Sequence, residues 1–227
     1  MKKLLLLSLF ISSSVFATGE STIHKFEKLG LSDIEVTPSP INGVEQVSTA
    51  EGIFYVSGDY FLAGKLYKLT DKQPIDMTNQ YLMGKLNAQE KEMIIYPAKN
   101  EKYVVTVFLD TSCHYCHLLF EKVPEYNQLG ITMRFMAFPR NGLHSQTAQQ
   151  MEAVWTSKNP TFALKQLENE QIYPKVLKEA NIVKKQYELG RKFGISGTPA
   201  IIMSNGEVLP GYIKPEQLIR ILEQEEH

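Results

Sequence analysis

The chain has 227 residues and is close to neutral, since 24 Lys and Arg side chains stand against 25 Asp and Glu side chains for a formal net charge of −1 at pH 7. It has no long basic block, which argues against nucleic acid as a partner. Hydrophobic residues make up 43% and charged residues 22%, proportions that are ordinary for a globular protein. The length suits one large domain or two smaller ones.

Residues 1–17 have the pattern of a secretory signal peptide. Lys2 and Lys3 precede an apolar run from Leu4 to Ile11, and a stretch rich in small residues follows and ends in Val15–Phe16–Ala17. We predict cleavage after Ala17 and export of the remaining chain. A retained membrane anchor is the alternative, but the apolar run is too short to span a bilayer.

Residues 18–77 predict a small domain of short strands. Turn-forming sequences such as Asn42–Gly43 and Ser57–Gly58 separate the apolar runs. Such a small meander buries only a thin core and usually needs a partner surface. The expected strands are Val44–Thr49, Ile53–Ser57, Tyr60–Ala63 and Leu66–Leu69, after an amphipathic segment that contains Ile23, Phe26 and Leu29.

Residues 78–95 predict a helical linker. Thr78 or Asn79 can cap the helix, and Leu82 and Leu86 belong to a narrow apolar stripe. A helix with so narrow a stripe either bridges two domains or lies on the surface of one. The sequence leaves both alternatives open.

Residues 96–227 predict an α/β domain in which a strand, a helix and a second strand precede a helix-rich region, a hairpin and a closing helix. This order is typical of a thioredoxin-like fold. The continuous apolar run at 104–109 is expected for a strand covered on both faces. The expected elements are strands Val104–Leu109 and Ile131–Phe138, helices within 146–189, strands Ala200–Met203 and Glu207–Leu209 around the turn Asn205–Gly206, and a helix from Pro215.

The two cysteines of the chain, Cys113 and Cys116, are three positions apart. A disulfide that closes so short a loop removes little chain entropy, about 2 kcal/mol against about 3 kcal/mol for a fifteen-residue loop. It would be a poor structural cross-link for a chain of this size. The pair is therefore better interpreted as reactive than as structural.

The position of the cysteines after a strand and at the start of a helix predicts redox chemistry. Asp110, Thr111 or Ser112 can cap the helix, which would place Cys113 in its first turn. Unpaired N–H groups at a helix N-terminus favour a thiolate, and the thiolate is the form that attacks a disulfide. The attack would join Cys113 to the substrate in a mixed disulfide, which Cys116 is expected to resolve. A protonated His114 would further favour the Cys113 thiolate.

Two other interpretations of the motif are open to the sequence. Cys113–His117 also satisfies C-x-x-C-H, the pattern of covalent haem attachment in exported proteins. Haem attachment does not require a buried strand leading into a helix, whereas a redox pair does, so we favour the redox pair. A metal site is weaker, because the second ligand pair of a closed tetrahedral site is missing. We therefore expect no metal and no cofactor.

Several segments of the chain resemble the DsbC/DsbG family of periplasmic disulfide isomerases. The resemblance runs over essentially the whole mature chain, which makes it more specific than the C-x-x-C motif alone. The segments that carry it are Asn87–Ile94, Val104–Asp110, the Cys113–His117 cluster, Ala137–Arg140, Gly197–Ala200, Ser204–Gly206 and Pro210–Tyr212.

The resemblance implies a thioredoxin-like C-terminal domain with a helical insertion, a helical linker, and a small cystatin-like α+β N-terminal domain that dimerises. Gly64 matches a glycine of the dimerising strand region, and Thr198–Pro199 matches a cis-proline loop that holds substrate peptide beside the cysteines. Misoxidised exported proteins would be the clients, and a membrane reductant of the DsbD type would supply electrons. The implied location is the periplasm.

The chain departs from a representative of that family in two ways. His114 stands where the representative has glycine, so that His114 and Tyr115 are expected to set the redox balance and to shift it toward oxidation. The representative also has a second disulfide, whose positions are matched here by Thr156 and Glu179. We expect the helical insertion to be held by packing alone.

Three functions fit the sequence. The leading one is a disulfide isomerase or reductase that rearranges incorrect disulfides and also binds clients as a chaperone does. The second is a DsbG-like reductase or a dithiol oxidase of the same fold. The third is a chaperone in which the cysteines are secondary.

Overall fold

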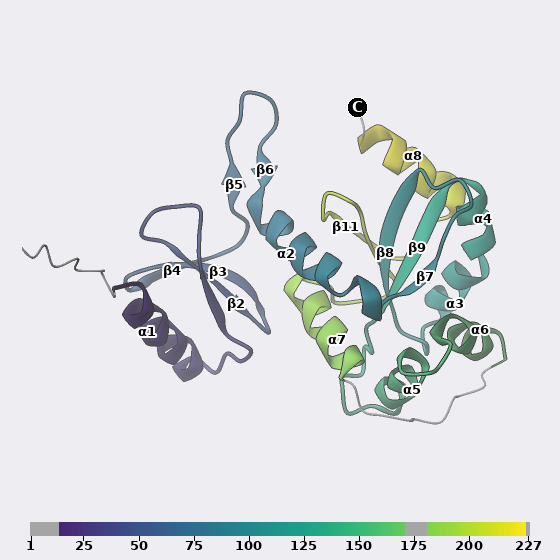
Figure 1. Cartoon of the computed structure of the whole chain (residues 1–227), viewed down its shortest axis with the longest axis horizontal. Helices are drawn as coiled ribbons and strands as arrows, with labels where there is room; N and C mark the ends of the chain where they lie inside the picture. Colours follow the sequence, from purple (N-terminus) through teal and green to yellow (C-terminus); the bar gives the residue numbers. More distant parts are fainter. Residues whose placement is uncertain (1–13, 171–180, 226–227) are drawn as a thin grey trace, which may run out of the picture. The chain divides into compact units, whose positions relative to one another are not determined.

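The computed structural model describes residues 14–170 and 181–225. The chain divides into two compact units, Met1–Gly64 and Lys65–His227 (Figure 1). The domain boundaries expected from the sequence, after residues 77 and 95, remain predictions. In the described part of the chain, no helix combines the length and the apolar character that a membrane span requires.

The N-terminal unit consists of one helix and one antiparallel sheet. Phe26 of the helix packs with Val47 and Val56 of the sheet in a small buried core. The sequence prediction missed the first strand, a polar segment that contains a proline. The elements are helix α1 (Ser14–Lys28) and strands β1 (Glu35–Pro38), β2 (Glu45–Thr49), β3 (Gly52–Ser57) and β4 (Tyr60–Ala63), in the order β1-β2-β3-β4.

Helix α1 begins at Ser14 and so continues across the cleavage site expected after Ala17. Residues 1–13, which hold the basic and apolar parts of the expected signal peptide, lie outside the described residues. The signal peptide therefore remains a prediction.

The second unit begins with a short hairpin and with the helix expected within residues 78–95. The hairpin pairs β5 (Tyr67–Lys68) with β6 (Ile75–Asp76), and helix α2 (Met77–Ala88) follows, with a 3-10 turn at Glu90–Glu92. The cap of α2 is neither Thr78 nor Asn79 as expected. Asp76 caps the helix by accepting a hydrogen bond of 2.8 Å from the backbone N–H of Asn79, while the Thr78 hydroxyl accepts one from the backbone N–H of Leu66.

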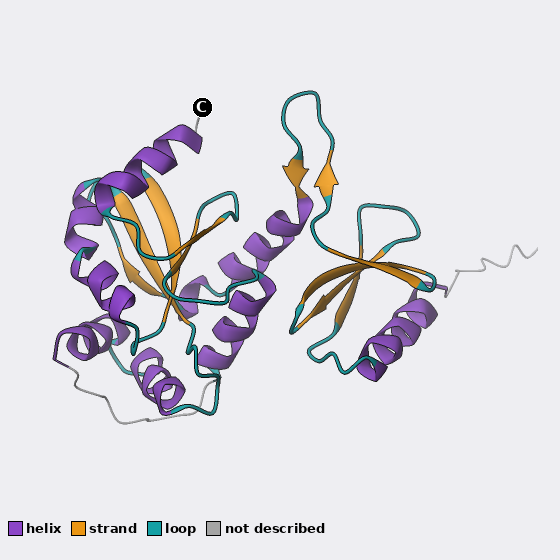
Figure 2. Ribbon diagram, turned by 180° about the vertical axis from the view of Figure 1, so that it is seen from behind, coloured by secondary structure: helices purple, strands orange, loops and turns teal. Residues whose placement is uncertain are grey.

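A five-stranded sheet in the order β11-β10-β8-β9-β7 forms the centre of the second unit. The central strands β8 and β9 run parallel, and the outer pairings are antiparallel. Helices lie on both sides of the sheet, as Figures 1 and 2 show, with α4 (Val123–Gln128) on one side and α7 (Ile182–Lys192) on the other. The strands are β7 (Ile94–Tyr96), β8 (Tyr103–Leu109), β9 (Ile131–Ala137), β10 (Ala200–Ile202) and β11 (Val208–Pro210), and the flanking helices are α3 (His114–Glu121), α4 (Val123–Gln128) and α8 (Pro215–Glu225).

This arrangement confirms the thioredoxin-like order expected from the sequence. Both long apolar runs are strands, and most of their residues are buried because helices cover both faces. The hairpin at Asn205–Gly206 and the helix from Pro215 are present as expected. Strand β7 was missed, since three residues are too few to show a strand period.

The helical insertion lies between β9 and β10 and consists of α5 (Gln146–Trp155), α6 (Pro160–Glu170) and α7 (Ile182–Lys192). The expectation that packing alone holds it is wrong. The Glu152 carboxylate accepts hydrogen bonds of 3.3 and 3.0 Å from the backbone N–H groups of Ile182 and Val183, at the start of α7. The Tyr96 hydroxyl donates to the Thr161 carbonyl oxygen at 2.7 Å.

Of the two positions that match the missing disulfide, only one is described. Thr156 follows α5, and its hydroxyl donates to the Glu152 carbonyl oxygen at 2.6 Å. Glu179 lies outside the described residues. Polar contacts therefore join α5 to α7 across the segment where the representative has a covalent link.

Candidate active site at the cysteine pair

Both cysteines lie at the junction between β8 and α3. Cys113 is the residue that caps α3, with extended backbone angles, and it is not in the first turn as the sequence suggested. Asp110 does not cap the helix, because its carboxylate is engaged by Ser112 and Arg140. The backbone N–H of Cys113 donates to the Asp110 carbonyl oxygen at 2.9 Å, and this turn carries the chain from the strand into the helix.

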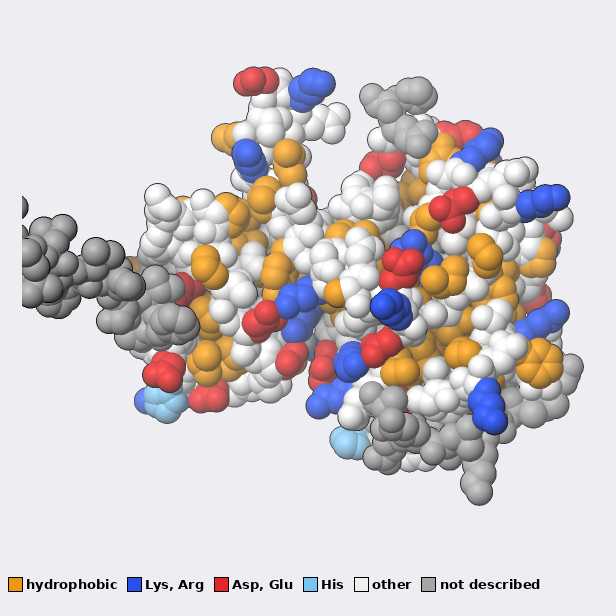
Figure 3. Space-filling view, in the orientation of Figure 1, with side chains coloured by type: hydrophobic (Ala, Val, Ile, Leu, Met, Phe, Trp, Pro, Cys, Tyr) orange, Lys and Arg blue, Asp and Glu red, His pale blue; other side chains and the backbone are white. Residues whose placement is uncertain are grey.

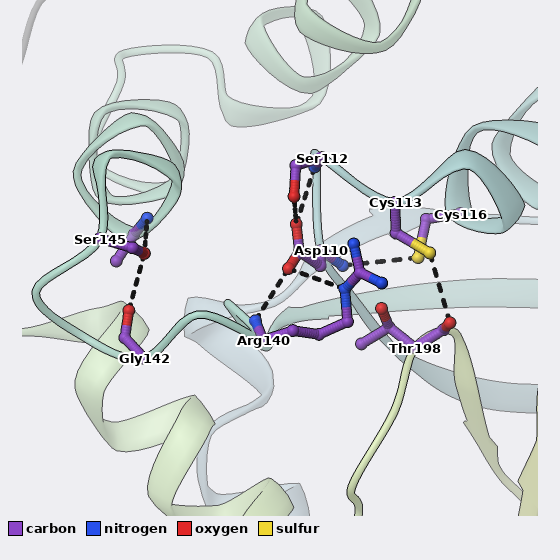
Figure 4. Close-up of polar contacts among 9 residues, drawn as sticks. Asp110, Ser112, Cys113, Cys116, Arg140, Gly142, Ser145 and Thr198 are labelled. Carbon is purple, nitrogen blue, oxygen red and sulfur yellow. Dashed lines mark hydrogen bonds and ion pairs between the residues drawn. The ribbon is translucent and has the colours of Figure 1, made fainter.

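The two thiols are free and buried, with only 3% of Cys113 and 1% of Cys116 exposed. The Cys113 Sγ donates to the carbonyl oxygen of Thr198 at 3.3 Å, and the Cys116 Sγ accepts from the backbone N–H of Asp110 at 3.5 Å (Figure 4). The two sulfurs therefore have different surroundings, one toward the Thr198 loop and one toward the end of β8.

These surroundings move the two thiol pKa values in opposite directions. Burial favours the neutral thiol of Cys113, but hydrogen bonding with Thr198 and Cys116 and the charge of Arg140 outweigh burial and lower the pKa of Cys113. For Cys116 burial dominates and raises its pKa far above the ordinary value. One thiol is therefore prepared for ionisation, and its neighbour keeps its proton.

A buried carboxylate lies beside the dithiol. Asp110 is fully buried, and its Oδ1 accepts from the Ser112 backbone N–H at 2.7 Å and from the Ser112 hydroxyl at 2.6 Å. Its Oδ2 accepts from the Arg140 backbone N–H at 2.8 Å and from Arg140 Nε at 3.1 Å (Figure 4). This pairing holds the Arg140 guanidinium near the sulfurs.

The loop that contains Thr198 lies opposite the cysteines. The Thr198–Pro199 peptide bond is cis, as the resemblance implied. Strand β10 starts at Ala200, which pairs with Phe108 of β8, so the sheet register brings the loop to the end of β8. The Thr198 hydroxyl is buried and has no hydrogen-bond partner within the described residues.

His114 and Tyr115, between the cysteines, are both exposed, and their rings contact each other at 5.6 Å between centroids. Arg140 is the cation whose charge lowers the pKa of Cys113. Gly64 belongs to the N-terminal unit, where it follows β4 with a φ of +148°. In the described ranges, no three His, Cys, Asp or Glu side chains are grouped as a metal site requires.

Sequence analysis missed one pair of residues next to the dithiol. His117 Nδ1 of α3 forms an ion pair with the Glu168 carboxylate of α6, and the Glu168 side chain is only 1% exposed. A signal was present, because Glu168 continues the buried stripe of Leu164 and Leu167 at helical spacing. A carboxylate at such a position needs a buried partner.

Comparisons with known proteins bear on the whole chain. A model described as the N-terminal domain of disulfide bond isomerase proteins matches residues 15–79, and a thioredoxin-like domain model matches residues 89–226. The thiol:disulfide interchange protein DsbC of Haemophilus influenzae is 49% identical over 227 residues, which cover 99% of both chains. The chain belongs to the DsbC family.

Other DsbC relatives are similar over nearly their full length. The DsbC protein of Pasteurella multocida is 49% identical over 99% of this chain and 100% of its own, and that of Escherichia coli K12 is 36% identical over 98% and 96%. A solved disulfide interchange protein from Neisseria gonorrhoeae aligns with a TM-score of 0.53 at 25% identity, over 60% of this chain and 97% of its own. Membership of the DsbC family favours the redox interpretation of the C-x-x-C-H motif over haem attachment.

Proposed function

We propose that this protein is a periplasmic disulfide isomerase in which Cys113 is the nucleophile and Cys116 the resolving cysteine. The observation that carries the proposal is the difference between the two thiols: the pKa of Cys113 is lowered, whereas that of Cys116 is raised. A thiolate attacks a disulfide and a thiol does not, so Cys113 is the attacking sulfur and Cys116 reacts only after it loses its proton.

The reaction begins when the Cys113 thiolate attacks one sulfur of an incorrect client disulfide. A bond forms between Cys113 and that sulfur, the client disulfide breaks, and the other client sulfur leaves as a thiolate. If another client thiolate then attacks the mixed disulfide, the client gains a new disulfide and Cys113 returns as a thiolate. No electrons are gained or lost overall, which is the definition of isomerisation.

Cys116 resolves a mixed disulfide between Cys113 and a client that no client thiolate attacks. It loses its proton and attacks Cys113, which releases the client reduced by two electrons and leaves a Cys113–Cys116 disulfide. The cycle then requires an external reductant, for which we propose a membrane protein of the DsbD type. Thr198 and Pro199, across from Cys113, would hold the client backbone.

We further propose that the protein works as a homodimer through its N-terminal unit. Strand β4 is paired with β3 alone in the sheet order, and all four of its residues are exposed. Tyr60 is 84% and Leu62 is 73% exposed, which is unusual for large hydrophobic side chains on a sheet edge. Hydrophobic side chains also reach the surface elsewhere on the face drawn in Figure 3.

The test is refolding of a scrambled substrate with several disulfides, with wild type beside Cys113→Ser and Cys116→Ser. We expect wild type to restore native activity, Cys113→Ser to be inactive, and Cys116→Ser to accumulate mixed disulfides with its clients. Fast oxidation of a reduced substrate by wild type, without recovery of the scrambled one, would contradict isomerisation.

His114 supports a second candidate, a DsbG-like reductase or a dithiol oxidase of the same fold. A histidine next to the attacking sulfur adds a group that can carry positive charge where the representative has glycine, and this favours the thiolate over the disulfide. We expect His114→Gly to make the reduction potential more negative, measured by equilibration with glutathione. Suppression of aggregation by a variant with both cysteines replaced would support an additional chaperone activity.

A further inference from the structure

An acid–base pair lies next to the dithiol without being part of the reaction proposed above. The Glu168 carboxylate is 1% exposed and the His117 side chain 27% exposed, and the two are in direct contact. His117 follows Cys116 in α3, and its backbone N–H donates to the Cys113 carbonyl oxygen at 3.2 Å. The pair therefore links the helical insertion to the helix that presents the thiols.

Within residues 14–170 and 181–225, few charged or titratable groups act on the pair. Besides Glu168, the groups whose charges act on His117 are Cys113 and Glu121 of its own segment. The charge of Asp110, after β8, acts on Glu168, and Glu168 acts on the phenol of Tyr96 in β7. That phenol donates to a backbone carbonyl oxygen of α6, so its proton is not available to Glu168.

His117 is the one polar partner of the Glu168 carboxylate among the described residues. Neither of its carboxylate oxygens has a hydrogen-bond partner in the described part of the chain beyond this ion pair. An isolated buried carboxylate is costly, and the cost falls when a neighbouring group shares a proton with it. A proton held between the two side chains therefore stabilises this arrangement.

The pKa directions agree with this geometry. Burial raises the pKa of Glu168 against the lowering effect of His117. Contact with Glu168 raises the pKa of His117 and outweighs burial, and Cys113 adds to the increase. Both directions favour a proton held by the pair over its loss to solvent.

We propose that Glu168 is a positioning residue, which keeps the His117 imidazole protonated so that the imidazolium stabilises the Cys113 thiolate. His117 belongs to α3, which Cys113 caps, and its backbone N–H donates to the Cys113 carbonyl oxygen, whereas Glu168 comes from α6. The positive member of the pair therefore lies on the helix that begins at Cys113. Arg140 supplies a second cation from the loop after β9. The inference rests on the proposed function in one respect, that Cys113 is the attacking thiol.

The test is a titration of Cys113 by thiolate absorbance, in a Cys116→Ser background so that a single thiol is observed. We expect Glu168→Gln to raise the proton affinity of Cys113 severalfold. If the affinity rises threefold, the reduction potential of the intact pair becomes more negative by roughly 14 mV, since a tenfold change corresponds to about 30 mV for two electrons. Glu121→Gln is the matched control, because Glu121 is exposed and its charge also acts on His117, and we expect a much smaller change.

A second set of variants separates positioning from a structural link. If Glu168 acts through His117, adding Glu168→Gln to His117→Gln will not shift the Cys113 titration further. Additive shifts, or an unchanged titration in a folded Glu168→Gln protein, would overturn the proposal. Glu168→Met keeps a side chain of similar volume but removes the carboxylate. An unchanged Cys113 titration in this variant would show that the contact with His117 only holds α6 in place. Failure of the proposed function is distinguishable, because wild type itself would then titrate as an ordinary thiol or leave the scrambled substrate unchanged.

Discussion

The Sγ atom of Cys113 lies 3.3 Å from the carbonyl oxygen of Thr198, although 85 positions separate the two residues in the chain. The sheet produces this contact. Strand β8 ends just before the cysteine segment, and β10 begins just after the Thr198 loop, and the two strands pair in register at Phe108 and Ala200. The backbone pairing of β8 with β10 therefore sets the distance between the sulfur and the loop.

The buried hydroxyl of Thr198 is predicted to act on the Cys113 thiolate. A carbonyl oxygen can only accept a proton and so favours the thiol, whereas the hydroxyl can donate to a thiolate. A hydrogen bond to a charged group contributes about 1.5 kcal/mol or more, so Thr198→Val should raise the proton affinity of Cys113 about tenfold. The measurement is the rate of alkylation against pH. Thr198→Ser keeps the hydroxyl and should show the wild-type pH dependence of alkylation. A wild-type pH dependence in Thr198→Val would contradict a role of the hydroxyl.

The Asp110 carboxylate is predicted to make stability depend on acid pH. Burial alone would raise its pKa, but hydrogen bonds from Ser112 and Arg140 outweigh burial and lower it. Because the folded-state pKa lies below the unfolded value, ionised Asp110 stabilises the fold at neutral pH, and this contribution is lost as the pH falls through the folded value.

The corresponding variant is Asp110→Asn. It should lower the free energy of unfolding by about 1–3 kcal/mol at pH 7, because it leaves the buried donors and Arg140 poorly matched. The loss should be smaller at pH 3, as measured by urea unfolding at both pH values. Asp71→Asn, at an exposed position of the hairpin, is the control and should change neither value. An equal loss at both pH values would contradict the assignment of charge to Asp110.

The exposed edge of β4 is predicted to hold two copies of the chain together. Phe61 packs on Phe26, so its neighbour Leu62 lies on the opposite face, where it is 73% exposed. Leu62→Lys should yield monomers by light scattering, with loss of isomerisation and retention of dithiol oxidation. Leu69→Lys places the same change on the hairpin, at 85% exposure, and should remain dimeric. A dimeric Leu62→Lys variant would place the interface elsewhere.

Two helical glycines are predicted to respond in opposite ways to alanine. A Cβ atom on Gly190 in α7 would lie 2.6 Å from the Phe138 ring and 3.1 Å from Phe108, whereas one on Gly84 in α2 would meet nothing within 4 Å. Gly190→Ala should therefore lower the free energy of unfolding by about 1–3 kcal/mol through overpacking. Gly84→Ala should raise it by up to about 1 kcal/mol through helix propensity. Thermal unfolding of both variants is the measurement, and equal effects would contradict the packing argument.

The sequence predicted the parts of this protein that depend on local signals. The strands at 104–109 and 131–138, the hairpin turn and the cysteine pair at a strand–helix junction all follow from patterns within a few residues. Strands β1 and β7 were missed because one contains a proline and polar residues and the other has three residues. The cap of α3 was wrong because Asp110 is engaged by Ser112 and by Arg140, a partner 30 positions away.

The rest of the site depends on contacts between distant segments. The place of Thr198 beside Cys113 came from a family resemblance, because no local pattern joins the two. The pairing of His117 with Glu168 is set by the packing of α6 near α3, which the sequence shows only as a charged residue on a buried stripe. A charged residue at a position expected to be buried thus indicates an ion pair or a hydrogen-bond partner, although the sequence does not identify that partner.

The polar contacts that hold the helical insertion have a consequence for how this protein matures. Its chain contains only two cysteines, and both belong to the working pair. Glu152 and Tyr96 hold the insertion where the representative relies on a second covalent link. No cysteine remains for a structural disulfide, and within one chain the two cysteines have only each other to pair with. A protein whose proposed task is to correct the disulfides of others should itself reach its native state in a fully reducing solution.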